Sequence, residues 1–512
     1  MSRWIAVTLL LALAVALVLR LPQLGARPLH NDEAVNAVKL TELWQHGRYS
    51  YDHDEYHGPT LHYFSLPFLW LAGPSQPEQL GDATLRLVTV AFGAGLILLL
   101  LLTADGLGRT ATIMAAAFIA ISPAMVFYSR YFIHEMLLVF FTALTIGAGW
   151  RYHQTRLARW ALVAGVGVGL MFATKETFVL AIAAIGAAIV LQCFWKAPTM
   201  GAASPWQLNF RHLALGSIAA LVVWLLFFSS FGTHWAGLVD SVRTYFPWLK
   251  RAGGHSPHLH PWYFYFERLG WFHPARSPVW SEGLILALAL IGIGVSLVAP
   301  KNPLHRFLAL YTIFLTAIYA VITYKTPWCL LGFYHGMILL AGIGLAALLE
   351  IIRVRALQTA AVLAVVGLGI QLGWQSWRGA VEFAANPRNP YVYAQTGDKV
   401  PALAERIEAL ARLGPAGADT VVKVVVPGSG YWPLPWYLRR LHHVGWYDAL
   451  PADPFAPIMV VASKFDARLD DKSDRKWIMA GMTEIRPQVF VELYVELELW
   501  KQFVATLPRE QD

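Results

Sequence analysis

Long apolar runs separated by short polar links dominate the first three quarters of the chain. A helix that crosses the hydrocarbon of a bilayer needs about 20 predominantly apolar residues, and several successive runs approach that length. The runs cover residues 4–21, 85–102, 110–127, 132–149, 160–172, 178–194, 213–231, 284–298, 307–322, 329–349 and 357–372. This pattern predicts an all-α polytopic membrane protein with about eleven transmembrane helices.

Two other apolar segments need a separate interpretation. The run at 61–71 is short and aromatic, which predicts an interfacial or re-entrant helix rather than a span. The first run at 4–21 has the length of a signal peptide core, but no small-residue cleavage site follows it. We therefore expect it to remain as a membrane anchor.

The basic residues of the short links predict the orientation of the chain. With the N-terminus inside, alternate links carry Arg109, Arg151, Lys301 and Arg353 on the inner side, as the positive-inside rule requires. The outer side then receives loops 22–84 and 232–282 and everything after residue 374. We expect a cell membrane protein, in the inner or plasma membrane, with a cytoplasmic N-terminus.

The pattern changes after the last predicted span. Residues 400–413 read as an amphipathic helix, and residues 421–426, 458–463 and 489–499 read as strands. The sequence therefore predicts a transmembrane domain at 1–375 and a small C-terminal extracytoplasmic α/β domain at 376–512.

Composition and charge agree with this architecture. Hydrophobic residues make up 57% of the chain and charged residues 14%, against about 25% charged in ordinary soluble domains, which excludes a soluble enzyme. The formal charge of +8 is explained by links that orient the chain, so we expect no nucleic-acid partner. Cys193 and Cys329 fall near opposite ends of their spans and are expected to be packing residues rather than a disulfide.

The first outer loop holds the densest polar cluster, with Asp32 and Glu33 shortly after the first span. Asp32 has two interpretations, an N-cap of a helix over 33–44 or a carboxylate that meets a lipid-borne substrate; spacing alone favours the cap. His53 and His57 are four residues apart and could ligate a metal on a helix, but Gly58-Pro59 favours a loop.

Further charged residues map to the same outer boundary. Arg130, His134 and Glu135 lie between the third and fourth runs, where they are either functional or an Arg130–Glu135 pair that joins two helices. Each remaining link is, in isolation, a case of interfacial snorkelling. These links carry Lys175 and Glu176, and Lys325. Because random snorkelling would not select one face, the shared location favours a common site.

The chemistry that suits such a site is transfer from a lipid phosphate. A sugar leaves polyprenyl phosphate together with a phosphate anion that needs nearby cations. The acceptor hydroxyl, by contrast, needs a base. One carboxylate and several Arg or Lys side chains at the membrane boundary are sufficient for that reaction.

The motifs resemble a known family. Asp32-Glu33, Arg130 with Glu135, and Thr174-Lys175 are similar to the membrane glycosyltransferases of the GT-C fold, in the group of protein O-mannosyltransferases and lipid A aminoarabinose transferases. A narrower resemblance, to the prokaryotic flippase-activity-associated proteins of archaeal N-glycosylation type, rests on five blocks. They are Asn31-Asp32-Glu33-Ala34, Tyr56-His57-Gly58-Pro59, Tyr324-Lys325-Thr326-Pro327-Trp328, Asn389-Pro390-Tyr391-Val392-Tyr393-Ala394 and Trp432-Pro433-Leu434-Pro435-Trp436-Tyr437-Leu438-Arg439.

The resemblance implies an inverting transferase that uses a dolichyl- or undecaprenyl-phosphate sugar on the outer face. Its acceptor would be a glycan, a lipid or a protein, in contact with membrane lipids. It implies Asp32 as the base with Glu33 in support. The donor phosphate would be held by Arg130, Lys175, His57 and Lys325, supported by Glu135, His134, Tyr56 and Glu176.

Two further points concern residues where the resemblance is incomplete. The aminoarabinose transferases carry a lysine where this chain has His57. The resemblance implies no certain cofactor, because metal use varies within the GT-C group; a divalent metal would find candidate ligands in His57 and Glu135.

Alternative functions follow from the same residues. A lipid-linked sugar flippase, or its accessory, should place ionisable groups near the bilayer midplane, whereas the predicted spans are largely apolar there, which favours the enzyme. An anchored scaffold would not need so many spans. Trp432, Trp436 and Tyr437 either stack on an acceptor sugar or pack the outer domain, and packing is favoured.

Overall fold

The computed structural model describes residues 3–54, 57–195, 209–248 and 258–507. Its contacts divide the chain into two compact units. Unit 1 contains Met1–Leu24, Glu42–Leu71 and Leu85–Tyr393, and unit 2 contains Gly25–Thr41, Ala72–Thr84 and Ala394–Asp512. The helical unit thus continues past the expected boundary at residue 375, and unit 2 includes two segments of the first outer loop.

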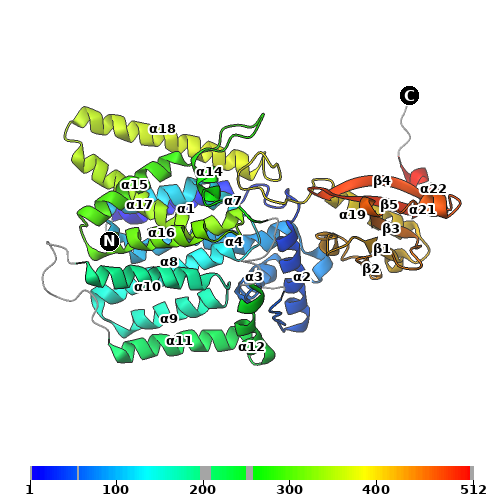
Figure 1. The fold of residues 1–512 in the computed structure, drawn as a ribbon, viewed down its shortest axis with the longest axis horizontal. Coiled ribbons are helices and arrows are strands. Elements are labelled where there is room, and N and C mark those ends of the chain that lie inside the picture. Colours follow the sequence, from blue (N-terminus) through cyan, green and yellow to red (C-terminus); the bar gives the residue numbers. More distant parts are fainter. Residues whose placement is uncertain (1–2, 55–56, 196–208, 249–257, 508–512) are drawn as a thin grey trace. The chain divides into compact units, whose positions relative to one another are not determined.

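Every run that was expected to span the membrane lies on a helix (Figure 1). These helices are α1 (Arg3–Arg20), α4 (Asp82–Leu99) with the 3-10 turn η2 (Leu100–Leu102), α6 (Arg109–Ile121), α8 (Glu135–Thr155), α9 (Ala158–Phe172), α10 (Phe178–Phe194), α11 (Phe210–Phe228), α15 (Gly283–Val298), α16 (Pro303–Val321), α17 (Leu331–Ile351) and α18 (Arg355–Ala380). Among the described residues, 6 helices are long and apolar enough to cross a membrane, counting adjoining 3-10 turns. The multi-pass membrane class is confirmed, and the number of spans stays a prediction.

Shorter elements connect these helices. They are α2 (Asn31–His46), α3 (Thr60–Ala72), η1 (Pro77–Gln79), α5 (Ala104–Leu107), α7 (Pro123–Tyr128), α12 (Ala236–Arg243), α14 (Phe264–Gly270) and η3 (Pro327–Leu330). The predicted interfacial helix at 61–71 corresponds to α3, which contains Pro67. Its location at the bilayer surface stays a prediction.

Glycines set the closest helix contacts of unit 1. A Cβ atom on Gly292 of α15 would lie 1.9 Å from the Leu340 carbonyl oxygen of α17, and one on Gly344 would lie 2.0 Å from the Leu288 oxygen. Gly165 of α9 is equally close to the Gly216 oxygen of α11, at 2.0 Å. Small residues allow helix backbones to approach this closely where lipid provides no hydrophobic driving force.

A buried carboxylate joins four segments of unit 1. Glu282, the N-cap of α15, is 1% exposed. It accepts hydrogen bonds from Ser122 Oγ at 2.6 Å, the Ala124 backbone N–H at 2.8 Å, and the hydroxyls of Tyr334 and Tyr391 at 2.5 Å each. Four donors compensate for the loss of water around the carboxylate.

Unit 2 contains a five-stranded sheet of order β2-β1-β3-β5-β4. The central strand β3 (Ile458–Ala462) pairs in parallel with β1 (Val422–Val425), which pairs in parallel with β2 (Val444–Tyr447). On its other side, β3 is antiparallel to β5 (Val489–Glu496), which is antiparallel to β4 (Trp477–Arg486). The small C-terminal α/β domain is confirmed, with β1, β3 and β5 at the expected positions.

Helices complete unit 2. They are α19 (Val400–Leu413), η4 (Gly417–Asp419), α20 (Leu434–Tyr437), η5 (Ser463–Phe465), α21 (Leu469–Lys472) and α22 (Leu497–Thr506). The apolar face of α19, including Leu403, Ile407 and Leu410, is buried in one cluster with Val424 and Val460 of the sheet. The sheet and α19 therefore share one hydrophobic core.

Candidate active site

Residues 57–60 lie along the link between α9 and α10. The Gly58 N–H donates to the Thr174 oxygen at 3.1 Å, and the Thr60 N–H donates to the Ala173 oxygen at 3.1 Å. A Cβ atom on Gly58 would lie 2.2 Å from the Ala173 oxygen. Glycine is therefore required for the approach that brings His57 beside the α9–α10 link.

His57 forms an ion pair with Glu176. His57 Nδ1 lies 2.7 Å from Glu176 Oε2, and the two side chains are 42% and 6% exposed. Burial opposes ionisation of Glu176, but the imidazole, a backbone hydrogen bond and the charge of Lys175 together hold the pKa of this carboxyl below its ordinary value. The exposed edge of the ring can contact a ligand while Glu176 fixes its orientation.

A second buried ion pair lies next to the first. Lys175 Nζ contacts Glu135 Oε1, and both side chains are less than a tenth exposed. Burial opposes the charge on Lys175, but the Glu135 carboxylate raises its pKa above the ordinary value. Two of the alternatives that the sequence left open are therefore excluded. Lys175 and Glu176 do not snorkel, because both are buried, and the partner of Glu135 is Lys175 rather than Arg130.

Arg130 binds the turn that follows α1. Its Nη1 donates to the Arg20 oxygen at 2.6 Å and the Pro22 oxygen at 2.7 Å, and its Nη2 donates to the Gln23 oxygen at 3.2 Å. Arg20 itself donates to the last carbonyls of α6, including the Ala120 oxygen at 2.9 Å. Arg130 is thus placed to hold the ends of helices together.

His134 contacts the backbone of Gly58. Its Nε2 lies 3.0 Å from the Gly58 oxygen, and its ring centroid lies 5.3 Å from that of His57. A carbonyl oxygen only accepts hydrogen bonds, so Nε2 of His134 carries the proton and donates to Gly58. Tyr56, expected beside it, lies outside the described residues.

Lys325 is buried at the C-terminal end of α16. Its ammonium donates to the oxygens of Ile322 and His260, the latter at 3.3 Å, and burial lowers its pKa. The positive charge faces carbonyls at a helix C-terminus, an arrangement that the helix dipole favours.

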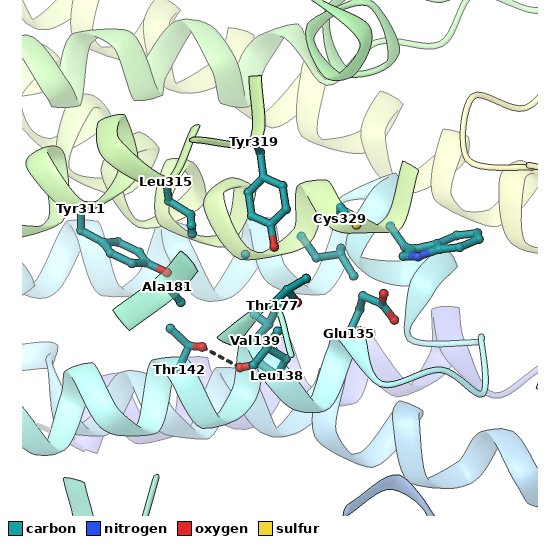
Figure 2. Close-up of a pocket in the computed structure, with 13 residues that line it drawn as sticks. Glu135, Leu138, Val139, Thr142, Thr177, Ala181, Tyr311, Leu315, Tyr319 and Cys329 are labelled. Carbon is teal, nitrogen blue, oxygen red and sulfur yellow. Dashed lines mark hydrogen bonds between the residues drawn. The ribbon is translucent and has the colours of Figure 1, made fainter. Parts of the chain in front are cut away.

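A narrow cavity lies beside the Lys175–Glu135 pair (Figure 2). Figure 2 shows Glu135 toward one end and Tyr311 toward the other, with Thr142 and Tyr319 between them. The cavity encloses about 20 Å³, which suits a single water rather than a sugar. Polar side chains therefore extend into the helical bundle further than the apolar pattern of the spans indicates.

The two acids of the first outer loop occupy different environments in unit 2. Helix α2 begins at Asn31, so Asp32 lies in its first turn rather than at the N-cap. The Asp32 side chain is 46% exposed, with Asp32 Oδ1 3.9 Å from His30 Nδ1. Glu33 is fully buried, accepts the His30 N–H at 2.9 Å, and pairs with Arg27 at 3.1 Å. Asp32 is therefore available to a substrate, whereas Glu33 holds the loop.

The aromatic segment around α20 separates into two groups. Trp436 is fully buried, and its Nε1 donates to Asp82 Oδ1 at 2.9 Å. The Tyr437 hydroxyl accepts from the Leu29 N–H at 2.8 Å and donates to Asp82 Oδ2 at 3.1 Å. The favoured packing interpretation fits Trp436 and Tyr437, while Trp432 is half-buried.

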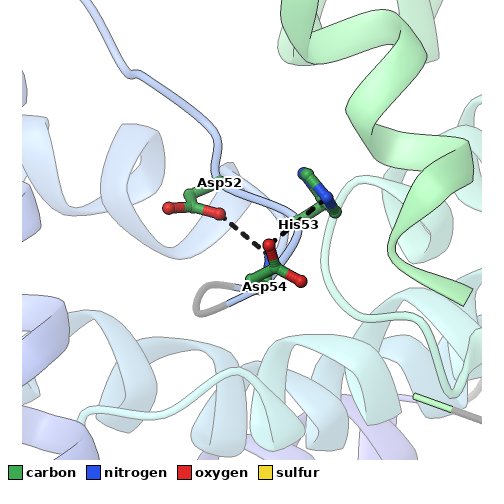
Figure 3. Close-up of side chains that lie close together, drawn as sticks. All are labelled: Asp52, His53 and Asp54. Atoms are coloured by element: carbon green, nitrogen blue, oxygen red, sulfur yellow. Dashed lines mark hydrogen bonds and ion pairs between the residues drawn. The ribbon is translucent and has the colours of Figure 1, made fainter. Parts of the chain in front are cut away.

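One group in the described part of the chain could hold a metal ion. The ligand atoms of Asp52, His53 and Asp54 lie within 4.8 Å of one another (Figure 3). His53 also lies 3.5 Å from Asp240. His57 and Glu135, the expected metal ligands, instead pair with Glu176 and Lys175. Carboxylate and imidazole ligands at the exposed 52–54 turn suit a hard or borderline divalent cation.

Comparisons with known proteins show what this sequence and fold are similar to. Residues 57–237 match the family model described as dolichyl-phosphate-mannose-protein mannosyltransferase. The chain is similar to ArnT from Cupriavidus metallidurans bound to undecaprenyl phosphate, with a TM-score of 0.63 and 15% identity over 97% of this chain and 98% of that chain. The chain has the GT-C fold.

Archaeal GT-C proteins show the same likeness. The oligosaccharyltransferase of Archaeoglobus fulgidus tethered with an acceptor peptide matches with a TM-score of 0.57 and 12% identity, over 87% of this chain and 64% of that chain. AglB from the same organism, in complex with an inhibitory peptide and a dolichol-phosphate, matches with a TM-score of 0.56 and 12% identity, over 91% and 70%. No curated protein matches the sequence significantly.

The family match and the structural neighbours support a glycosyltransferase. The matched segment contains two of the ion pairs described above, those of His57 with Glu176 and of Lys175 with Glu135. Asp32 lies outside the matched segment.

Proposed function

We propose that this GT-C protein transfers a sugar from a polyprenyl-phosphate donor to an acceptor on the extracytoplasmic face of the cell membrane, with inversion at the sugar carbon. The observation that carries the proposal is the adjacent His57–Glu176 and Lys175–Glu135 ion pairs in the segment similar to mannosyltransferases. Neighbours that bind undecaprenyl phosphate or dolichol-phosphate support the class of donor.

In this proposal, His57 and Lys175 face the donor phosphate. When the bond from the sugar carbon to the phosphate oxygen breaks, that oxygen keeps the electron pair, and fixed cations stabilise the charge. Glu176 and Glu135 hold the two cations in place before the substrate arrives. His57 is the more exposed of the two, so it contacts the phosphate directly, and Lys175 contributes its charge from a more buried position.

Asp32 is the proposed base. Its exposed carboxylate accepts the proton of the acceptor hydroxyl as that oxygen bonds to the sugar carbon, and a single displacement inverts the carbon. Glu33 supports Asp32 by holding the loop through Arg27. We assign Arg130 and Lys325 to positioning of helix ends, because their side chains bind backbone carbonyls.

A flippase remains the runner-up function. A transporter of this class would need a polar passage at the membrane midplane wide enough for a sugar. The cavity lined by Thr142 and Tyr311 encloses about 20 Å³, which admits about one water. The family match and the GT-C neighbours favour the transferase.

The test is sugar transfer in membranes that contain the protein, supplied with a labelled polyprenyl-phosphate sugar and a cell-envelope extract as acceptor. Asp32→Asn should lower the rate by about 10²- to 10⁴-fold, the range of general-base catalysis, at normal expression. Asp474→Asn, an exposed acid of unit 2, is the matched control. Wild-type turnover in Asp32→Asn would remove the base from the proposal. Mass spectrometry of envelope glycans with and without the protein would identify the acceptor through a missing sugar.

A further inference from the structure

The loop that leads into Asp32 is held by residues from the C-terminal part of unit 2. Gln395 Nε2 donates to the Pro28 oxygen at 2.9 Å, and Thr396 Oγ1 donates to the Leu29 oxygen at 2.6 Å. The Leu29 N–H donates to the Tyr437 hydroxyl at 2.8 Å. Consecutive residues of the loop are therefore fixed by side chains that come more than 360 positions later in the sequence.

The C-terminal part of unit 2 also supplies a cation, Arg486, that contacts the residue before Asp32. Arg486, the last residue of β4, donates from Nη1 to Asn31 Oδ1 at 3.4 Å. Burial lowers the pKa of Arg486, and the negative charge of Asp32 opposes this shift. Asn31 also donates to Asp32 Oδ1 at 3.4 Å. Asn31 thus links the guanidinium to the carboxylate.

The backbone around Arg486 is itself fixed. The pairing of β4 with β5 shifts register between Glu484 and Arg486, and the Gly397 N–H donates to the Ile485 oxygen at 3.0 Å. A Cβ atom on Gly397 would lie 2.4 Å from the Glu484 oxygen. The chain that follows Tyr393 is therefore clamped both to the end of β4 and to the loop before Asp32.

Resting on the proposed role of Asp32, we propose that Arg486 is a positioning residue of the transferase, through which the C-terminal domain completes the base site. Arg486 acts through Asn31, which hydrogen-bonds both the guanidinium and the Asp32 carboxylate in the first turn of α2. A catalytic group must be held within about 0.5 Å of its productive position, and a displacement of about 1 Å costs up to about 100-fold in rate. The C-terminal part of unit 2 thus helps to position the catalytic base.

The experiment compares full-length Arg486→Ala and Arg486→Lys with the control Arg475→Ala, an exposed arginine of the same unit. Arg486→Ala should lower kcat by about 10- to 100-fold while the KM for the lipid donor stays within about twofold. Arg486→Lys should recover part of the loss, and added guanidinium should restore Arg486→Ala but not Asp32→Asn. The melting temperature in detergent should be the same in all variants.

The outcomes separate the two proposals. Wild-type kcat in Arg486→Ala together with an inactive Asp32→Asn would overturn the role of Arg486 and leave the base intact. A loss of kcat that neither lysine nor guanidinium repairs, with a lowered melting temperature, would make Arg486 a purely structural residue and also overturn the inference. Wild-type turnover in Asp32→Asn would instead overturn the proposed function.

Discussion

Glu176 Oε2 lies 2.7 Å from His57 Nδ1, although the two residues are 119 positions apart in the chain. The contact depends on the backbone pairing of Gly58 with Thr174. It joins the segment before α3 to the link between α9 and α10. The distance between these two side chains therefore depends on how α3, α9 and α10 are arranged.

The first prediction concerns pH. The pKa of Glu176 is lowered in the folded protein from its ordinary value of 4.5. The contact with His57 therefore contributes stability that is fully present above about pH 4.5 and is lost as the pH falls through the lowered value. Without the imidazole the carboxyl protonates at higher pH, so His57→Gln should begin to lose stability at higher pH than the wild type.

The measurement is the melting temperature in detergent between about pH 3 and pH 7. At neutral pH the cost of His57→Gln should be only about 1 kcal/mol, because the ring is 42% exposed. Identical acid profiles for the two proteins would contradict the coupling. Glu176→Gln should remove the acid-sensitive contribution altogether and serves as the reference.

The second prediction separates stability from donor binding in the Lys175–Glu135 pair. Lys175→Met leaves a buried carboxylate without its partner, which typically costs about 3–5 kcal/mol. The double variant Glu135→Gln/Lys175→Met removes both charges and should recover most of that stability. Neither variant should recover affinity for polyprenyl phosphate. Thermal unfolding and titration with polyprenyl phosphate provide the two readouts. Wild-type affinity in the double variant would exclude Lys175 from phosphate binding.

The third prediction uses the close approach at Gly58. Gly58→Ala would place a methyl group 2.2 Å from the Ala173 oxygen, so the two segments must separate, at a cost of about 1–3 kcal/mol. Transfer should fall with it because His57 and Glu176 move apart. Gly186→Ala on α10 is the control, since a methyl group there meets nothing within 4 Å. Equal activity and stability in the two variants would show that the approach is unimportant.

The fourth prediction distinguishes packing from acceptor binding among the aromatic residues of unit 2. Trp436→Ala removes a fully buried side chain that binds Asp82 and should cost about 3–5 kcal/mol. Trp432→Ala should leave the melting temperature almost unchanged, because this ring is only half-buried. Acceptor KM measured for Trp432→Ala tests sugar stacking directly: an increase supports it, and an unchanged KM removes Trp432 from the acceptor site.

Much of the helical architecture could be predicted because lipid imposes one strong rule, a long uninterrupted apolar run. The strands were predicted less completely. Strand β2 (Val444–Tyr447) has intermediate burial throughout, and β4 (Trp477–Arg486) is mostly half-buried or exposed. Both lie at the edges of the sheet, and neither shows the strict alternation of buried and exposed positions by which a half-buried strand is predicted.

The charged residues of the site could be predicted by type but not by partner. Sequence spacing suggested Arg130 as the partner of Glu135, whereas the fold supplies Lys175. Likewise, nothing in the sequence distinguishes Asp32 from its neighbour Glu33, yet one is 46% exposed and the other fully buried. Arg486 was missed because only the folded sheet brings β4 to Asn31, and no local motif surrounds it.

The carboxylate of Glu282 has a mechanical consequence. Since its four donors come from three separate parts of unit 1, at residues 122–124, Tyr334 and Tyr391, no part can move away alone without leaving a buried acid unpaired. In helix α11, by contrast, only 6% of the apolar segment is buried. We therefore expect the α6, α15 and α17 side to behave as a stiff frame. Movements that admit a long isoprenoid tail should therefore occur outside this frame, along the exposed face of α11.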